Sequence, residues 1–168
     1  MKGTRNIIIY AILLVVQVLI CNYANLSQYI VLSFLPALVL CLPVQTRPLI
    51  AMVAAFAMGL AVDFFSTGML GLMSVALVPV AASRRLIIRI VFGQELFARN
   101  ENINIHRHGL PKLALAVLIS QALYFIIFTV VDCAGTRSFW FCLLRTVLSV
   151  LVSTLVSVLV AAEITSEG

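Results

Sequence analysis

Two ionisable residues, Asp63 and Arg145, lie inside long apolar stretches of the sequence. Charged side chains within a membrane-spanning segment are costly, so they are usually paired with each other or face a water-filled cavity. In the topology derived below, both residues lie at a similar depth near the outer ends of antiparallel helices. We therefore predict an ion pair between Asp63 and Arg145. A proton relay through Asp63 is the alternative, but no chain of Asp, Glu or His neighbours supports it.

Small and polar residues recur at every fourth position around both charges. One stripe contains Ala51, Ala55, Gly59 and Asp63, and the other contains Arg145, Ser149, Ser153, Ser157 and Ala161. Positions four apart share one face of a helix, and small residues allow two helix backbones to approach closely in a membrane. We predict that the two stripes face each other, with the ion pair at the outer end.

The cysteines and histidines do not form a recognisable metal or catalytic motif. Cys21, Cys41, Cys133 and Cys142 lie within or at the ends of apolar segments, without the spacing of a zinc site. His106 and His108 flank Arg107 in a polar stretch with no further donors nearby. The motifs of serine hydrolases, zinc proteases and phosphate-binding loops are also missing. We predict buried thiols, a solvated histidine loop, no metal, no cofactor and no enzymatic activity.

The composition indicates that these residues are positioned within a bilayer. Of the 168 residues, 63% are hydrophobic and 10% are charged, with a mean hydropathy of +1.17, whereas soluble domains carry about 25% charged residues. The net charge of +5 does not indicate a nucleic-acid partner, because the basic residues lie at the ends of apolar runs and not on a polar face.

Six apolar runs predict an all-α, polytopic membrane protein with about six transmembrane helices in a single domain, residues 1–168. The expected helices span approximately 6–22, 29–44, 48–66, 68–84, 111–132 and 139–162, with a cytoplasmic loop at 85–110. Pro36 predicts a kink in the second helix. Lys2 and Arg5 before an apolar run resemble a secretory signal, but no cleavage site follows, which predicts a retained first helix.

The distribution of basic residues predicts the orientation of these helices. Cytoplasmic loops accumulate lysine and arginine, and the arrangement that places both termini in the cytoplasm leaves only Arg137 in an outer loop. Arg85 and Arg89 lie one helical turn apart, beside apolar residues. This segment is predicted to be either an interfacial amphipathic helix or an extension of the fourth helix.

Gly59, Asp63 and Ser66 are followed by Gly68 and Gly71, which open the next apolar run, and by Arg84 and Arg85, which close it. This group of residues resembles the rod shape-determining protein MreD, in its Bacteroidetes-type version. Gln17 to Asn22, Pro36 and the Leu42-Pro43 pair also match the start of that family. It covers roughly residues 7–92, whereas residues 93–110 depart from the family pattern.

This resemblance implies a non-catalytic scaffold in the bacterial inner membrane, within the rod or elongation complex that builds peptidoglycan. The implied partners are the membrane lipid bilayer, an MreC-like protein, the actin-like MreB and a RodA-type glycosyltransferase with its transpeptidase. The family is similar in fold to the substrate-binding (S) subunits of energy-coupling-factor vitamin transporters. Such a subunit is the alternative function. Its ligand would lie near Tyr23, Tyr29, Asp132, Arg137 and Trp140, although aromatic residues there are also expected as interfacial anchors.

Overall fold

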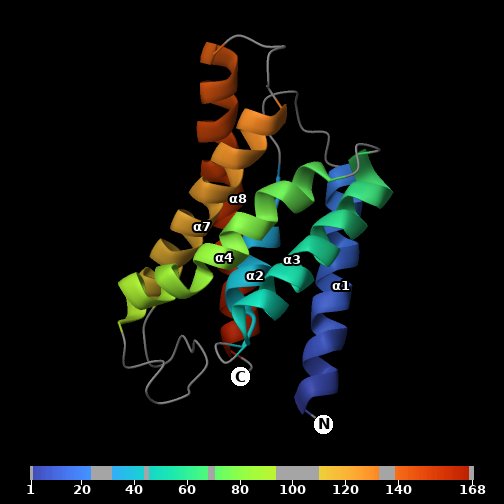
Figure 1. The fold of residues 1–168 in the computed structure, drawn as a ribbon, viewed down its shortest axis with the longest axis vertical. Coiled ribbons are helices and arrows are strands. Elements are labelled where there is room, and N and C mark those ends of the chain that lie inside the picture. The colour runs from blue at the N-terminus through green and yellow to red at the C-terminus, as the bar shows by residue number, and fades with distance from the viewer. Residues whose placement is uncertain are drawn as a thin grey trace.

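A computed structural model describes residues 2–23, 32–43, 46–67, 71–93, 110–132 and 139–166 of the chain (Figure 1). These residues form helices and no strands, so the predicted all-α class is confirmed for the described part of the chain. The helices are α1 (Lys2–Tyr23), α2 (Leu35–Cys41), α3 (Pro48–Val62), the π-helical turn η1 (Asp63–Thr67), α4 (Leu72–Phe92), α7 (Leu110–Asp132) and α8 (Phe139–Ser166).

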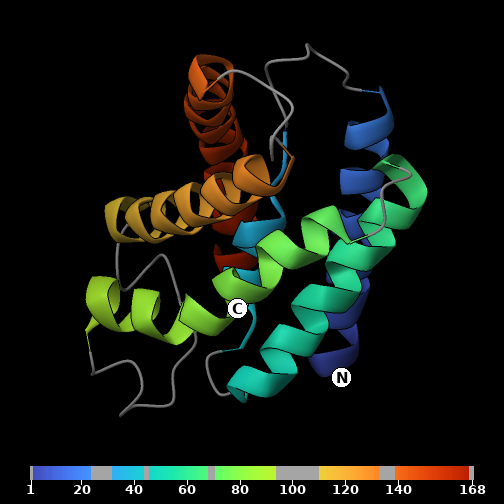
Figure 2. The ribbon, with the colours of Figure 1, turned by 45° about the horizontal axis from the view of Figure 1, so that its top comes forward.

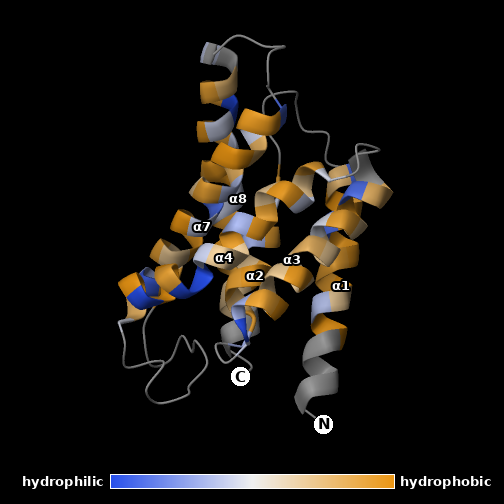
Figure 3. Ribbon diagram, viewed as in Figure 1, coloured by the Kyte–Doolittle hydropathy of each residue, from blue (hydrophilic) through white to orange (hydrophobic). Residues whose placement is uncertain are grey.

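Among the described residues, three helical segments are long and apolar enough to cross a membrane. They are Pro48–Phe65, Leu110–Asp132 and Cys142–Ala162, and Ile8–Asn22 is a shorter apolar helix. A bilayer core requires about 20 apolar residues in a helix, so these segments indicate a membrane protein. Figure 3 shows apolar residues along all the helices. The count of six spans stays a prediction.

The helices pack in an order that surrounds the short helix α2. Helix α3 packs mainly on α4, α4 on α7, and α7 on α8, while α2 contacts α4, α7 and α8. Helix α1 lies beside α3 and η1 on the other side of α2 (Figures 1 and 2). The first turn of α1 and the last turn of α8 lie at the same end of the bundle (Figure 1), which is compatible with the predicted placement of both termini.

Helix α2 is the centre of the core and differs from the predicted helix over 29–44. It spans only Leu35–Cys41, and residues 32–34 before it are not helical. Residues 34–40 of this segment are all buried. Pro36 lies in the first turn, where a missing N–H leaves no intrahelical bond unmade. The predicted kink at Pro36 is therefore wrong, because the proline begins a helix instead of interrupting one.

Helix α4 continues well beyond the predicted end at residue 84. It runs to Phe92 and ends at Gly93, whose φ of 81° is in the left-handed region that glycine adopts most easily. Residues 85–92 are therefore part of the fourth helix and not of a loop. The predicted extension of that helix is confirmed, and a separate amphipathic helix over these residues is wrong. Residues 94–109 of the predicted loop lie outside the described residues.

Candidate functional site

The non-helical residues 32–34 bring polar backbone groups into the buried centre of the bundle. Ser33 is fully buried, so its backbone cannot be satisfied by solvent. Irregular backbone at membrane depth is tolerated only where protein groups or enclosed water satisfy it. The side chains that bind this segment are Gln17 of α1, Gln121 of α7 and Ser153 of α8. With the buried polar residues Ser33, Tyr124 and Ser157 they form what we call the polar centre.

Gln17 of α1 binds the non-helical segment through both ends of its amide. Its Nε2 donates to the carbonyl oxygen of Leu32 at 3.1 Å, and the backbone N–H of Phe34 donates to its Oε1 at 3.0 Å. This side chain is fully buried. Gln17 thus supplies the two hydrogen bonds that a neighbouring strand or a continuing helix would otherwise provide, and it attaches α1 to the core.

The backbone groups of Ser33 are bound from the opposite side by α7 and α8. The Ser33 N–H donates to Ser153 Oγ at 3.1 Å, and Gln121 Nε2 donates to the Ser33 carbonyl oxygen at 2.9 Å. Gln121 Nε2 also donates to Ser157 Oγ. The backbone between the Leu32 carbonyl and the Phe34 N–H is therefore satisfied by side chains of three helices, which fixes the position of α2 between them.

The small-residue stripe of α3 is buried as predicted, but its partner differs from the prediction. Ala51, Ala55, Gly59 and Asp63 are all buried, and they face α4 instead of α8. A Cβ atom added at Gly59 would lie 2.7 Å from Ser74 Cα, which shows how closely the two backbones approach. The predicted contact between this stripe and the serine stripe of α8 is therefore wrong.

Asp63 binds the beginning of α4. Its carboxylate accepts hydrogen bonds from the backbone N–H groups of Gly71, Met73 and Ser74, at 3.1 to 3.3 Å, and from the Ser74 hydroxyl at 3.3 Å. The first N–H groups of a helix have no intrahelical partner, and a negative charge there is favourable. Asp63 therefore acts as an N-terminal cap supplied by the preceding helix, which favours a structural role over a proton relay.

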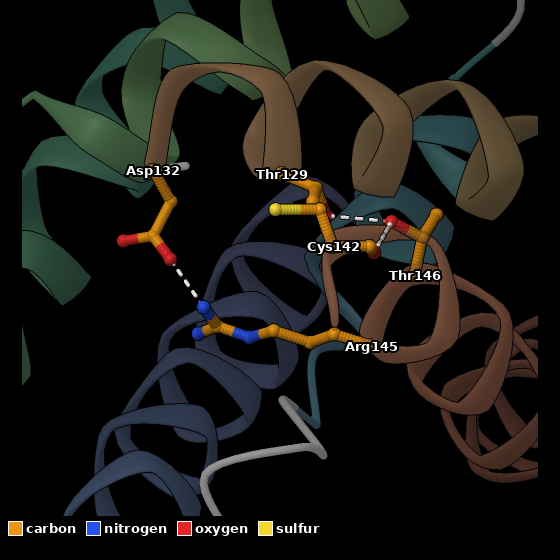
Figure 4. A network of polar contacts seen from close by, with 5 residues as sticks. All are labelled: Thr129, Asp132, Cys142, Arg145 and Thr146. Atoms are coloured by element: carbon orange, nitrogen blue, oxygen red, sulfur yellow. Dashed lines mark hydrogen bonds and ion pairs between the residues drawn. The ribbon is translucent and has the colours of Figure 1, made fainter. Parts of the chain in front are cut away.

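Arg145 forms its ion pair with Asp132, not with Asp63. Its Nη1 contacts Asp132 Oδ2 across the end of the α7 and α8 hairpin (Figure 4). The guanidinium carbon also lies 5.9 Å from the centre of the Phe128 ring. Next to this pair, the hydroxyls of Thr129 and Thr146 are hydrogen-bonded at 2.9 Å. The predicted pair of Asp63 and Arg145 is wrong, because each charge finds a partner closer along the chain.

The serine stripe of α8 is also buried. Ser149, Ser153, Ser157 and Ala161 are exposed by 1% or less. Helix α8 packs on α7 and α2, and two of these serines bind the polar centre through the contacts described above. The periodicity therefore identified the buried face of α8 correctly, and the partners of that face are Ser33 and Gln121.

Arg84 attaches α4 to the end of α2, and Arg85 attaches it to the segment before α3. Arg84 is 2% exposed, and its guanidinium donates to the carbonyl oxygens of Leu40, at 3.2 Å, and Leu42. Arg85 donates to the carbonyl oxygen of Thr46 at 3.4 Å. The last carbonyls of a helix lack intrahelical partners and carry partial negative charge. Arg84 therefore binds the C-terminal end of α2 as Asp63 binds the N-terminal end of α4.

Comparison of the chain with protein-family models, curated proteins and solved structures gives no match.

Metal and cofactor chemistry has few candidate groups in the described ranges. Within them, no group of three or more His, Cys, Asp or Glu residues could hold a metal ion. Cys21, Cys41 and Cys142 are partly buried, while Cys133 and both histidines lie outside the described residues. Of the residues that carry the family resemblance, Gly68 and the side chain of Ser66 also lie outside them.

Sequence reasoning missed Gln121 and Tyr124 and did not assign a role to Gln17. Each is a polar residue inside an apolar run, which is the signal that would have identified it. Ser33 gives the same signal, because it is a polar residue inside the apolar run 29–42. Of the predicted outward ligand residues, Asp132 binds Arg145 and Trp140 is 76% exposed. Tyr29, Arg137 and the side chain of Tyr23 lie outside the described part of the chain.

Proposed function

We propose that this protein is a non-catalytic membrane scaffold of the cell-wall elongation machinery, located in the bacterial inner membrane with both termini in the cytoplasm. Its partners would be an MreC-like protein, a RodA-type glycosyltransferase with its transpeptidase, and MreB. The proposal begins from the resemblance to MreD. Its mechanism is differential binding, in which the bundle holds partner transmembrane helices in one geometry and favours the active state of a synthase.

The observation that supports this function best is that the motif residues fix helix positions. Gly59 allows α3 to contact α4 closely, Asp63 binds the first turn of α4, and Arg84 binds the last carbonyls of α2. None of these roles requires a ligand or a reaction. Residues that build a fixed frame are what a scaffold requires, since its binding surface must keep one shape.

The outward faces of the helices give this frame an apolar binding surface. Large apolar side chains are exposed at intervals of three or four residues along α3 and α8. They are Leu49, Val53, Phe56 and Leu60 on α3, Phe64 on the adjoining turn η1, and Leu144, Val147, Leu151, Leu155 and Leu159 on α8. Such faces suit contact with lipid and with the transmembrane helices of partners.

The test is depletion of the protein in its native host, followed by microscopy of cell shape. Photo-crosslinking amino acids placed at Val53 and Leu155, which are 62% and 68% exposed, would capture membrane partners. Rounded cells and capture of an MreC-like protein or a wall synthase are expected. Cells of normal shape, together with capture of an ATPase-coupled transport module, would contradict the scaffold function.

The alternative is a vitamin-binding subunit of an energy-coupling-factor transporter, and the polar centre is the observation that favours it. Transporters often build their substrate sites from discontinuous helices near the middle of the membrane, and residues 32–34 are non-helical backbone among buried polar side chains. A vitamin that copurifies with the protein, or that raises its unfolding temperature, would favour transport over scaffolding.

A further inference from the structure

Three buried oxygen atoms of the polar centre have no hydrogen-bond partner among the described residues. They are Ser33 Oγ, Gln121 Oε1 and Tyr124 Oη, and all three residues are fully buried. A polar atom buried without a partner costs free energy, and in native proteins most such atoms are satisfied by protein or by ordered water. The three atoms therefore require an explanation.

The three atoms belong to residues that surround one place. Gln121 Nε2 donates to the Ser33 carbonyl oxygen, which puts the amide beside Ser33. Tyr124 follows Gln121 by three positions on α7, and so it shares the same helix face. The Tyr124 hydroxyl faces the Ser33 hydroxyl, but the two oxygens do not meet the distance and angle of a hydrogen bond. One small ligand between these side chains can reach all three atoms.

The types of atom decide the chemistry of the ligand. An amide oxygen only accepts hydrogen bonds, whereas each hydroxyl both donates and accepts. A cation would leave the hydroxyl hydrogens without acceptors, and an anion would be repelled by the Gln121 oxygen. A neutral group that both donates and accepts satisfies the whole set. We propose that a single water molecule is bound between Ser33, Gln121 and Tyr124.

Water is favoured over a larger hydroxyl compound because the surroundings are filled by large side chains. Phe34 and Phe125 are each 1% exposed, and the Tyr124 ring centroid lies 5.1 Å from that of Phe125. A buried water usually makes about three hydrogen bonds to groups that would otherwise be unsatisfied. Here the water donates to Gln121 Oε1 and accepts from the Tyr124 hydroxyl. It also forms a hydrogen bond with Ser33 Oγ, and so it links the Ser33 side chain to α7.

The first test is thermal unfolding of the full chain in lipid nanodiscs, with the variants Ser33→Ala and Tyr124→Phe made singly and together. Each single variant removes one partner of the water and is expected to lower the midpoint by about 2–4 °C. The double variant is expected to lower the midpoint by less than the sum of the two single effects, because the first substitution already weakens the binding of the water.

Thr154→Val is the matched control for this experiment. Thr154 Oγ1 on α8 is also buried without a partner among the described residues, so it forms no hydrogen bond with Ser33 or Tyr124. Replacing such a hydroxyl by a methyl group of the same shape is expected to leave the midpoint unchanged or to raise it. If Ser33→Ala and Tyr124→Phe behave like Thr154→Val and are additive, the water site is overturned.

A high-resolution structure of the full chain in nanodiscs gives the second test. The proposal expects one spherical density peak within about 3.2 Å of Ser33 Oγ, Gln121 Oε1 and Tyr124 Oη, and the loss of that peak in Tyr124→Phe. An empty position overturns the proposal. Density larger than a single atom also overturns it, and would show a pocket for a larger ligand instead.

Discussion

Replacing Gly59 by alanine should force α3 away from α4. The added Cβ would lie 2.7 Å from Ser74 Cα and 2.8 Å from Ser74 N, and backbone atoms of a helix cannot move aside as a flexible side chain does. Overpacking a tight contact costs up to about 3 kcal/mol, while alanine gains about 1 kcal/mol of helix propensity over glycine. The net loss is about 2 kcal/mol.

This loss should lower the unfolding midpoint by about 4–8 °C for a chain of this size. The assay is the fraction of protein in nanodiscs that stays monodisperse in size-exclusion chromatography after heating. Ala57→Gly, on the exposed face of the same helix, is the matched control and isolates the propensity term, with an expected loss of about 1 kcal/mol.

A second substitution tests whether the contact is made by backbone atoms. Ser74→Ala removes the hydroxyl, which lies 3.0 Å from the added Cβ, but leaves Ser74 Cα and N in place. It should therefore not rescue Gly59→Ala. A Gly59→Ala protein that is as stable as the parent chain, or one that Ser74→Ala restores, would refute the reasoning.

Three further experiments test the polar contacts. Gln17→Leu leaves the Leu32 carbonyl and the Phe34 N–H without their partner. We therefore expect a loss of about 3 kcal/mol in the free energy of unfolding, measured by thermal unfolding. An unchanged stability would show that these two hydrogen bonds do not hold α1 to the segment before α2. Asp132→Asn and Arg145→Gln should be coupled in a double-mutant cycle, whereas Asp63→Asn and Arg145→Gln should be additive within about 0.5 kcal/mol; the reverse pattern would restore the pairing predicted from the sequence. Asp63→Asn alone should cost about 1–2 kcal/mol in the same assay, since an amide nitrogen cannot accept from the first N–H groups of α4, and an unchanged midpoint would refute its capping role.

Periodicity predicted which helix faces are buried but not what they contact. The stripe of Ala51, Ala55 and Gly59 on α3 is buried, as is the serine stripe on α8. A spacing of four residues defines a face of one helix and contains no information about the neighbouring helix. The predicted contact assumed in addition that the two stripes face each other. In the structure α3 packs on α4, and α8 packs on α7 and α2.

The partners of the charged residues were close in sequence, and this was the signal that the prediction overlooked. Asp63 binds N–H groups eight to eleven residues later, at the start of the next helix. Arg145 binds Asp132, thirteen residues earlier, across the connection between α7 and α8. A charge near the end of one apolar run is therefore well placed to bind the beginning of the next run. Matched depth in distant helices was weaker evidence.

The non-helical segment at residues 32–34 could not be derived from hydropathy, because an irregular apolar segment and an apolar helix can have the same composition. The polar residues that bind this segment explain why it lies where it does. Gln17 and Gln121 would each be costly in an apolar interior without partners, and the unpaired backbone of residues 32–34 would be equally costly. Each satisfies the other, so neither the buried glutamines nor the non-helical segment would be stable alone. The two glutamines and residues 32–34 therefore fix the centre of the bundle together. A substitution at any one of them should weaken the packing of α1, α2 and α7 at the same time.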